Sequence, residues 1–412
     1  MSMREPANLP PPILTDGTNP FAYNTMRVRH PQMLQNVLDA NPNFPGVVKD
    51  ALLILQEDLQ TNAPIPVLNL FPTPAPDYVE WASAYIERRT IYSRGGSPAW
   101  LNVDWFFSET MLFRAIMEGV RWWELGRDPY APIKEHELNS MELWDLLDMA
   151  LQLDGGVVDR LPQLIRFATW GNRMDLSYAA SMEQGALADD KDLLVDDSEA
   201  VKEHMIRAQL EMFPHEEQGA SHIIIDNHGT ELAMDLALTD ALLTGFSDVV
   251  VLHVKYHPTF VSDATAYDVR DLIERCVSGN HGGRTSPAIF GMGQRLQAAL
   301  NAGRLRLAPH FYWNSCNFMW LMPQILQRIF DGAQLVVVKG DANYRRIVGD
   351  AIWETTTPFA EVLDYFPSPL LALRTLKSDP IVGLPPGMEA ELNFEDSEWR
   401  VNGKRGVIQL KI

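Results

Sequence analysis

The sequence predicts an α/β protein in two parts, a mainly helical part over residues 1–205 and an α/β part over residues 206–412. Two observations predict this division. Before about residue 205 the apolar residues recur at helical spacing, whereas after it short runs of β-branched residues alternate with helical segments. Between the two lies the stretch from Met182 to His204, in which eight acidic residues stand against two lysines. That composition is typical of a solvated boundary.

The helical part contains several segments with apolar residues at helical spacing. They run from Thr25 to about Leu59, from Tyr78 to Ser93, from Asn102 to Trp123, from Met141 to Leu153 and from Val157 to Trp170. The most informative is Asn102 to Trp123, an aromatic-rich helix that carries Glu109. A carboxylate in such a helix either pairs with a neighbouring arginine in the core or supports a functional site. The spacing leaves both open.

The second part begins with a strand, a helix and a second strand. The runs Ser221–Ile225 and Val249–Lys255 are the predicted strands, and Asp226, Asn227 and Asp263 follow their carboxyl ends. In open parallel sheets these ends share one crevice, so the three oxygen donors are expected to converge on a hard divalent cation. The alternative is that Asp226 and Asn227 only form a turn and cap the next helix.

Further strands and basic residues follow. Arg304 to Phe311 and Ala333 to Lys339 are predicted strands, Trp320 to Phe330 is a predicted helix, and the last thirty residues resemble a hairpin around an Asn-Gly turn. Lys339 precedes a glycine turn and a helix start, where backbone N–H groups favour an anion. With Arg345 and Lys377, it is the expected clamp on phosphoryl oxygens.

Composition excludes several classes of partner. The formal net charge of −20 disfavours nucleic acid and anionic membranes, because both are bound through clustered Lys and Arg. Two cysteines, Cys276 and Cys316, provide neither a disulfide framework nor a cysteine-based zinc site. No signal peptide and no run of about 18 apolar residues is visible. A cytoplasmic location is therefore expected.

Four blocks together resemble the damage-control phosphatases, in the subfamily with an Arg-Thr-x-Lys element. The blocks are Asp226-Asn227-His228-Gly229-Thr230-Glu231, Ser262-Asp263-Ala264, Lys339-Gly340-Asp341-Ala342-Asn343-Tyr344-Arg345 and Arg374-Thr375-Leu376-Lys377. The resemblance implies a three-layer, Rossmann-like α/β/α sandwich with a helical N-terminal domain. It also implies a metal-dependent hydrolase of small phosphorylated metabolites, sugar phosphates such as fructose phosphates first among them.

By match to the family pattern, Asp226, Asn227 and Asp263 would hold the metal. Manganese is expected first, with cobalt, nickel and magnesium as alternatives. The residues expected to line the substrate pocket by this match are Glu231, Asp341, Asn343, Tyr344, Arg345 and Lys377. Lys339, Arg374 and Glu109 complete the expected substrate-binding set.

Alternatives remain open for both mechanism and function. A metal-activated water is the expected nucleophile, because His228 stands where haloacid-dehalogenase phosphatases have a second aspartate, which disfavours direct attack by Asp226. A second hypothesis, which the resemblance alone suggests, is S-adenosylmethionine-dependent carboxyl methylation. The glycine-rich loop usual in methyltransferases is missing, and a third hypothesis is a non-catalytic helical interaction protein. His253 and His257 lie four apart but follow a strand, so structural roles are expected rather than zinc binding.

Overall fold

A seven-stranded sheet organises the computed structural model, which describes residues 3–68, 75–93, 96–171, 192–210, 219–279 and 286–412. The strands lie in the order β1-β7-β6-β5-β2-β3-β4. Their bounds are β1 Leu193–Asp196, β2 Ser221–Ile224, β3 Val250–Lys255, β4 Leu305–His310, β5 Leu335–Lys339, β6 Leu370–Thr375 and β7 Gly406–Lys411. Strands β2 to β6 pair in parallel, whereas β7 runs antiparallel to β6 and parallel to β1.

Helices cover both faces of the sheet, so the expected α/β/α sandwich is confirmed. One face packs against α8 (Met141–Leu151), α9 (Val157–Trp170), α11 (Ser198–Leu210), α12 (Thr230–Gly245), α13 (Ala266–Ser278) and α14 (Pro287–Asn301). The other packs against α15 (Gln324–Gln327), α16 (Asp341–Val348), α17 (Phe359–Val362) and α18 (Met388–Glu395). Within β5, Val337 enters the first core and Val336 the second. Burial on both faces explains why the strands read as continuous apolar runs.

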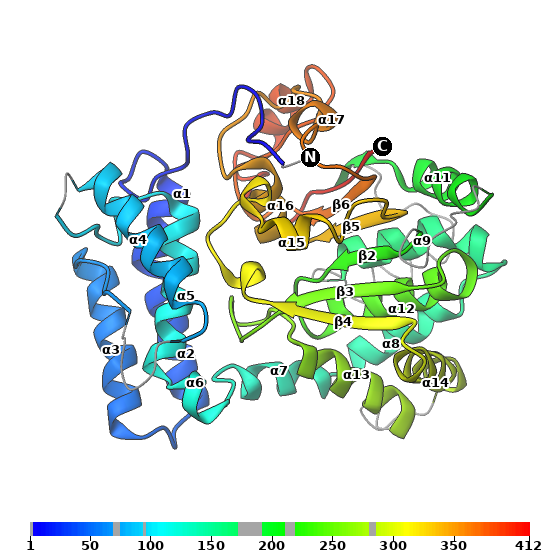
Figure 1. Ribbon diagram of the computed structural model, residues 1–412, viewed down its shortest axis with the longest axis horizontal. Coiled ribbons are helices and arrows are strands. Elements are labelled where there is room, and N and C mark those ends of the chain that lie inside the picture. The colour runs from blue at the N-terminus through cyan, green and yellow to red at the C-terminus, as the bar shows by residue number, and fades with distance from the viewer. Residues whose placement is uncertain (1–2, 69–74, 94–95, 172–191, 211–218, 280–285) are drawn as a thin grey trace.

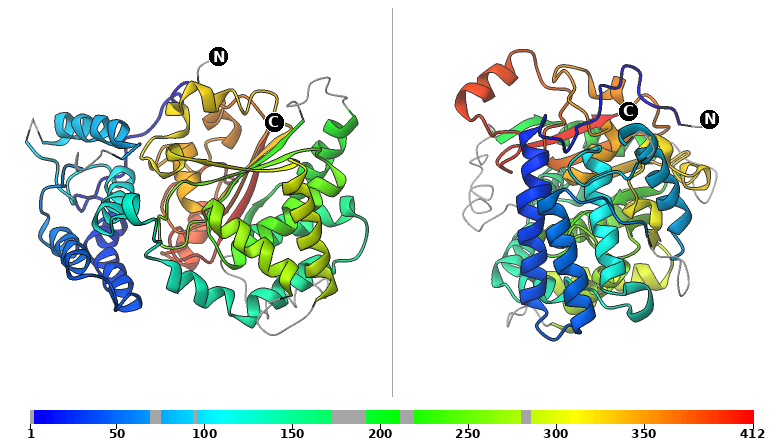
Figure 2. Two further views of the ribbon diagram at one scale, coloured as in Figure 1. Left: turned by 60° about the horizontal axis from the view of Figure 1, so that its bottom comes forward. Right: turned by 90° about the vertical axis from the view of Figure 1, so that its left-hand side faces the viewer.

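A separate bundle of N-terminal helices stands beside the sheet, at the left of Figure 1 and facing the viewer on the right of Figure 2. Its elements are α1 (Pro20–Asn24), the π-helical turn η1 (Thr25–Arg29), α2 (His30–Ala40), α3 (Gly46–Thr61), α4 (Tyr78–Tyr92), α5 (Trp105–Gly119) and α6 (Trp122–Leu125). They share a third apolar core. The helix α7 (Ala131–Leu138) connects the bundle to the sandwich.

The packing differs from the expected division at residue 205. The elements α8, α9 and β1 all precede that residue, yet α8 and α9 fill the core on the sheet and β1 pairs with β7. Helical spacing in the sequence could not show which core a helix joins. We therefore propose a division near Gly126, which ends α6. Part of the acidic stretch, including Glu183, Asp189 and Asp190, lies outside the described residues.

Two other local predictions were wrong. The last residues form no hairpin among the described elements, because the strand β7 pairs with β6 rather than with a strand on the other side of the Asn-Gly turn. The segment from Trp320 to Phe330 contains only the short helix α15 after a 3₁₀ turn, Met319–Leu321. Among the described residues, no helix combines the length and the apolar character needed to cross a bilayer.

Candidate active site

A cavity of about 410 Å³ lies between the N-terminal bundle and the carboxyl ends of the central strands. Its volume falls within the range of roughly 300–1,000 Å³ usual for small-molecule sites. The strand order reverses between β2 and β5, since β3 and β4 follow on one side of β2 and β6 on the other. Ligands in open α/β sheets bind at such a switch point. The cavity therefore occupies the expected crevice.

Asp226, Asn227 and Asp263 all line this cavity. Backbone contacts join the two segments that carry them: Asn227 and Asp263 form an isolated β-bridge, and the amide of Ala264 donates to the carbonyl of Asp226 at 2.8 Å. The Asn227 amide nitrogen donates to Asp226 Oδ2 at 3.0 Å, and its oxygen accepts from the Ser262 hydroxyl at 2.6 Å. The same nitrogen donates to Glu231 Oε2 at 2.8 Å, so a turn of this amide would direct its oxygen toward Asp226 and Glu231.

Gly340 allows the tip of β5 to approach Asp226 closely. Its φ is +84°, and a Cβ at this position would lie 1.9 Å from Asp226 Oδ2. Its amide donates to the Leu373 carbonyl of β6 at 2.9 Å, so the turn is tied to the sheet. Only a residue without a side chain fits between the strand tip and the carboxylate.

The two aspartates are buried and poorly compensated. Burial, and then the charges of Asp263 and Glu231, raise the pKa of Asp226 well above its usual range, and Asp226 Oδ1 has no hydrogen-bond partner in the part of the chain that the structure describes. Burial raises the pKa of Asp263 to about 6, although Lys255, 3.2 Å from Asp263 Oδ2, opposes the increase. Unpaired buried carboxylates are costly, so the site favours a cation.

Lys339 is a buried counterion, which corrects its expected role as a phosphate clamp. Its ammonium lies 3.2 Å from Glu231 and 3.0 Å from Asp235, and it donates to the Ala168 carbonyl. It does not line the cavity. Four buried carboxylates, those of Asp226, Glu231, Asp235 and Asp263, then face the two buried lysines Lys255 and Lys339. When all six groups are ionised, the cluster has an excess of two negative charges. That excess, beside the unpartnered Asp226 oxygen, fits a divalent cation bound through oxygen.

The described residues contain no group of three or more His, Cys, Asp and Glu side chains that could hold a metal ion by themselves. Asp226 and Asp263 would therefore need oxygen from Asn227, from water or from the substrate to complete a coordination shell. Hard cations accept carboxylate, amide and water oxygen alike. The donor set fits an open site rather than a closed structural one.

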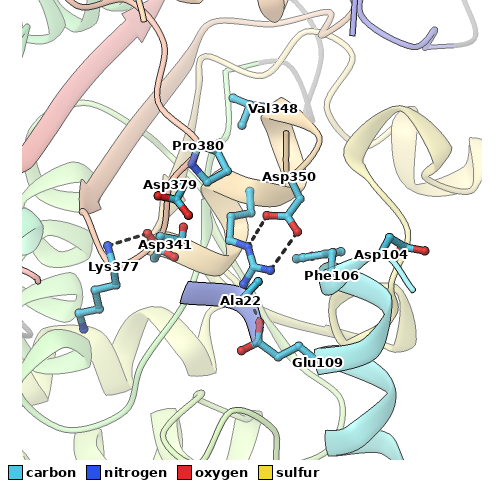
Figure 3. A network of polar contacts seen from close by, with 12 residues as sticks. Ala22, Asp104, Phe106, Glu109, Asp341, Val348, Asp350, Lys377, Asp379 and Pro380 are labelled. Carbon is cyan, nitrogen blue, oxygen red and sulfur yellow. Dashed lines mark hydrogen bonds and ion pairs between the residues drawn. The ribbon is translucent and has the colours of Figure 1, made fainter. Parts of the chain in front are cut away.

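Arg345 lines the cavity, but its charge is shared between two carboxylates. Glu109 from α5 and Asp350 lie on two sides of its guanidinium (Figure 3), with contacts of 2.6 Å to Glu109 and 2.7 and 3.0 Å to Asp350. The guanidinium also stacks on the Trp105 ring at 3.8 Å. Burial opposes ionisation of Glu109, but Arg345 and His30 outweigh it and lower its pKa to about 2. Glu109 therefore both pairs with an arginine and lines the site.

The loop after β6 places Lys377 at the cavity wall. Asp341 Oδ1 accepts a hydrogen bond from the Lys377 amide at 2.9 Å (Figure 3). It also accepts one from Arg374 Nε at 2.8 Å. Arg374 is fully buried and also donates to the carbonyl and hydroxyl of Ser378. Arg374 is thus a positioning residue for the loop, whereas the expectation was direct contact with the substrate. The exposed Lys377 forms no ion pair within the described residues.

Asn343 and Tyr344 do not line the cavity, in contrast to the expectation. The Asn343 amide donates to the Lys339 carbonyl at 2.9 Å, and the Tyr344 hydroxyl donates to Gln409 Oε1 at 2.9 Å. Asp341 and Arg345, four residues apart on α16, share the face toward the cavity. Asn343 and Tyr344 lie on the remaining faces and fasten the helix to the sheet.

The bundle contributes lining residues that the sequence did not reveal. They are Phe21, Thr25, Arg29, His30, Met33, Trp105 and Phe113. Phe260 and Val261 also line the cavity, with φ values of +47° and +68° that are rare for bulky residues and mark local strain beside Asp263. The bundle residues approach the sheet only through tertiary packing, so no local sequence motif predicts that they line the cavity.

The two histidines that could have suggested zinc have other contacts. His253 is buried with its Nε2 3.0 Å from His222 Nδ1, between aromatic rings. His257 Nδ1 lies 3.2 Å from the Asn314 amide. Neither lines the cavity. Both have structural contacts, as expected.

The fold and cavity define an α/β/α protein with an acidic pocket suited to a divalent cation and an anionic ligand. A family model, the damage-control phosphatase ARMT1-like domain, matches residues 25–392. Damage-control phosphatase ARMT1 of Xenopus tropicalis is 29% identical over 95% of this chain and 96% of its own length. The Homo sapiens protein of the same name is 28% identical over 94% and 96%.

This chain belongs to the damage-control phosphatase ARMT1-like family. It is a metal-dependent phosphoric monoester hydrolase of metabolite damage control, acting on small phosphorylated metabolites. A solved structure, a DUF89 family protein from Pyrococcus horikoshii, is 14% identical with a TM-score of 0.43 and covers 92% of this chain and 98% of its own. That similarity is too low to add to the argument.

Proposed function

We propose that this protein hydrolyses sugar phosphates, in the first place fructose phosphates, with Mn²⁺ as its preferred metal in the cytoplasm. In this proposal Asp226, Asn227 and Asp263 hold the metal. The observation that carries it is the unpartnered Asp226 Oδ1 in a buried cluster with an excess of negative charge, at the wall of a cavity of about 410 Å³. Without a cation, that cluster would repel a phosphate.

A bound divalent ion would neutralise phosphoryl charge and lower the pKa of a water. Lys377 supplies the second positive charge: it lines the same cavity, and its charge opposes the increase in the pKa of Asp226 that burial causes. Arg345 has its charge balanced by Glu109 and Asp350, so it contributes directed N–H donors rather than net charge. Phosphoryl transfer depends mainly on such positioning and charge neutralisation.

We propose water rather than Asp226 as the nucleophile. A covalent route through Asp226 needs a neighbouring acid and base for the leaving group. His228, two residues later, is buried with its Nδ1 3.5 Å from Asp268, and it does not line the cavity. It cannot serve a substrate there. Hydrolysis by water requires no such partner at that position.

The test is a screen of fructose 1-phosphate, fructose 6-phosphate, phosphopantetheine and nucleoside monophosphates with manganese, cobalt, nickel and magnesium. We expect the highest kcat/KM for a fructose phosphate with manganese, and no turnover without metal. Higher kcat/KM for a nucleotide than for every sugar phosphate would contradict the substrate assignment. Higher activity with another metal would contradict the metal assignment alone.

A further inference from the structure

The N-terminal helix that borders the cavity contains a π-helical turn. The elements α1, η1 and α2 follow one another without interruption, and the His30 amide donates to the Thr25 carbonyl five residues earlier. Pro31 explains the turn, because its ring would clash with the carbonyl of Arg27 in a regular α-helix, and it has no N–H to donate. The wider turn redirects side chains, and such turns are frequent at functional sites.

Thr25, in this turn, lines the cavity, and its hydroxyl is buried without a partner among the described residues. The residue is 5% exposed. The buried helical threonines Thr110, Thr169 and Thr239 instead donate to the carbonyl four residues earlier, at 2.6, 2.8 and 2.7 Å. Buried hydroxyls normally find a partner. No hydrogen bond among the described residues holds the Thr25 hydroxyl in its buried position, so rotation about the Cα–Cβ bond can turn it toward a ligand in the cavity.

The turn is held in place relative to the opposite wall. His30 Nε2 lies 3.0 Å from Glu109 Oε1, and Glu109 Oε2 accepts from Arg345 of α16 at 2.6 Å. This chain of contacts joins the turn to the helix that starts at the tip of β5. The same helical segment also lines the cavity with the apolar side chains of Phe21 and Met33 and the basic side chain of Arg29. Such a surface suits a group that presents both C–H faces and hydroxyls.

We propose that the π-helical turn forms a leaving-group subsite in which Thr25 hydrogen-bonds a hydroxyl of the polyol part of the substrate. The proposal rests on the proposed function, since it assumes a sugar phosphate whose phosphate end lies at Asp226 and Lys377. Thr25 can donate to or accept from a hydroxyl. It is a specificity-determining residue, because a site that bonds a substrate hydroxyl discriminates against analogues without it.

The test compares wild-type protein with Thr25→Val and Thr25→Ser, all loaded with manganese. The substrates are fructose 1-phosphate and 4-nitrophenyl phosphate, whose leaving group has no aliphatic hydroxyl. We expect Thr25→Val to lower the ratio of kcat/KM for the sugar phosphate to that for the aryl phosphate by about tenfold, through KM. Thr25→Ser keeps the hydroxyl and should restore most of the ratio. By calorimetry, binding of fructose 1-phosphate should weaken more than binding of inorganic phosphate.

A matched control is Thr61→Val, another helical threonine, which is exposed and donates to the Glu57 carbonyl. It should leave the ratio unchanged. An unchanged ratio in Thr25→Val, an equal loss for both substrates, or a loss in Thr25→Ser as large as in Thr25→Val would overturn the subsite. A different result would contradict the proposed function: wild-type protein that hydrolyses the aryl phosphate but no sugar phosphate. That result would contradict the subsite as well.

Discussion

Replacing Gly340 with alanine should disable the site. The same substitution at a second glycine, Gly303, is the control for backbone strain alone. Both Gly340, at φ +84° and ψ 171°, and Gly303, at φ +72°, have a positive φ. Alanine with a positive φ costs about 1–3 kcal/mol of stability, and the ψ of Gly340 places that position toward the upper end of the range. At Gly303 nothing lies within 4 Å of the added Cβ, whereas at Gly340 the Cβ would lie 1.9 Å from Asp226 Oδ2.

The carboxylate of Asp226 would therefore have to retreat by about 1 Å, since real Cβ contacts do not fall below 3.0 Å. A displacement of that size can reduce the rate on the order of 10²-fold. Urea unfolding should show a loss of stability for both variants, and the larger loss for Gly340→Ala. Equilibrium dialysis with Mn²⁺ and the phosphatase assay should show a defect in Gly340→Ala alone. Equal metal affinity and equal turnover in the two variants would refute the placement of Asp226 at the centre of the site.

Three further predictions concern the same residues. Asp226→Ala, or chelation of the metal, should abolish hydrolysis, and added manganese should restore only the chelated wild type; turnover that survives chelation would contradict the metal assignment. Arg374→Met leaves the half-buried Asp341 without its ion pair to a fully buried arginine, so urea unfolding should show a loss of about 1.5–3 kcal/mol, and an unchanged midpoint would rule out a positioning role. Glu109 has a pKa lowered from 4.5 to about 2, so its interaction with Arg345 stabilises the protein above pH 4.5 and is lost as the pH falls toward 2. The stability difference between wild type and Glu109→Gln, followed by urea unfolding, should therefore narrow from pH 5 downward; a constant difference would show that the charge of Glu109 is not responsible.

Much of the sandwich could be predicted because its signals are local. A run such as Ser221–Ile225 shows a buried strand, and a carboxylate, an amide and a glycine directly after it show where that strand ends. The parallel arrangement then places polar groups from different strand tips in one crevice. Asp226, Asn227 and Asp263 could be grouped on this basis, although 37 residues separate the two aspartates.

The roles of the basic residues could not be predicted in the same way. Lys339, Arg345 and Lys377 each follow an apolar segment, and the sequence treats them alike. In the structure the first is a buried counterion, the second is shared between two carboxylates, and the third is exposed at the cavity. Which acidic side chains surround a lysine depends on packing between distant segments, because charges interact through space rather than along the chain.

The sequence by itself determined the α/β class, the strands β2 to β5 and the oxygen-rich strand tips, since periodicity and turn chemistry act over a few residues, and the family resemblance added the three-layer sandwich. Only the tertiary structure decided that α8, α9 and β1 belong to the sheet and that Thr25 and His30 border the cavity. Those outcomes depend on which apolar core each element packs against. An amphipathic helix encodes that it must bury one face, but not which partner will cover it.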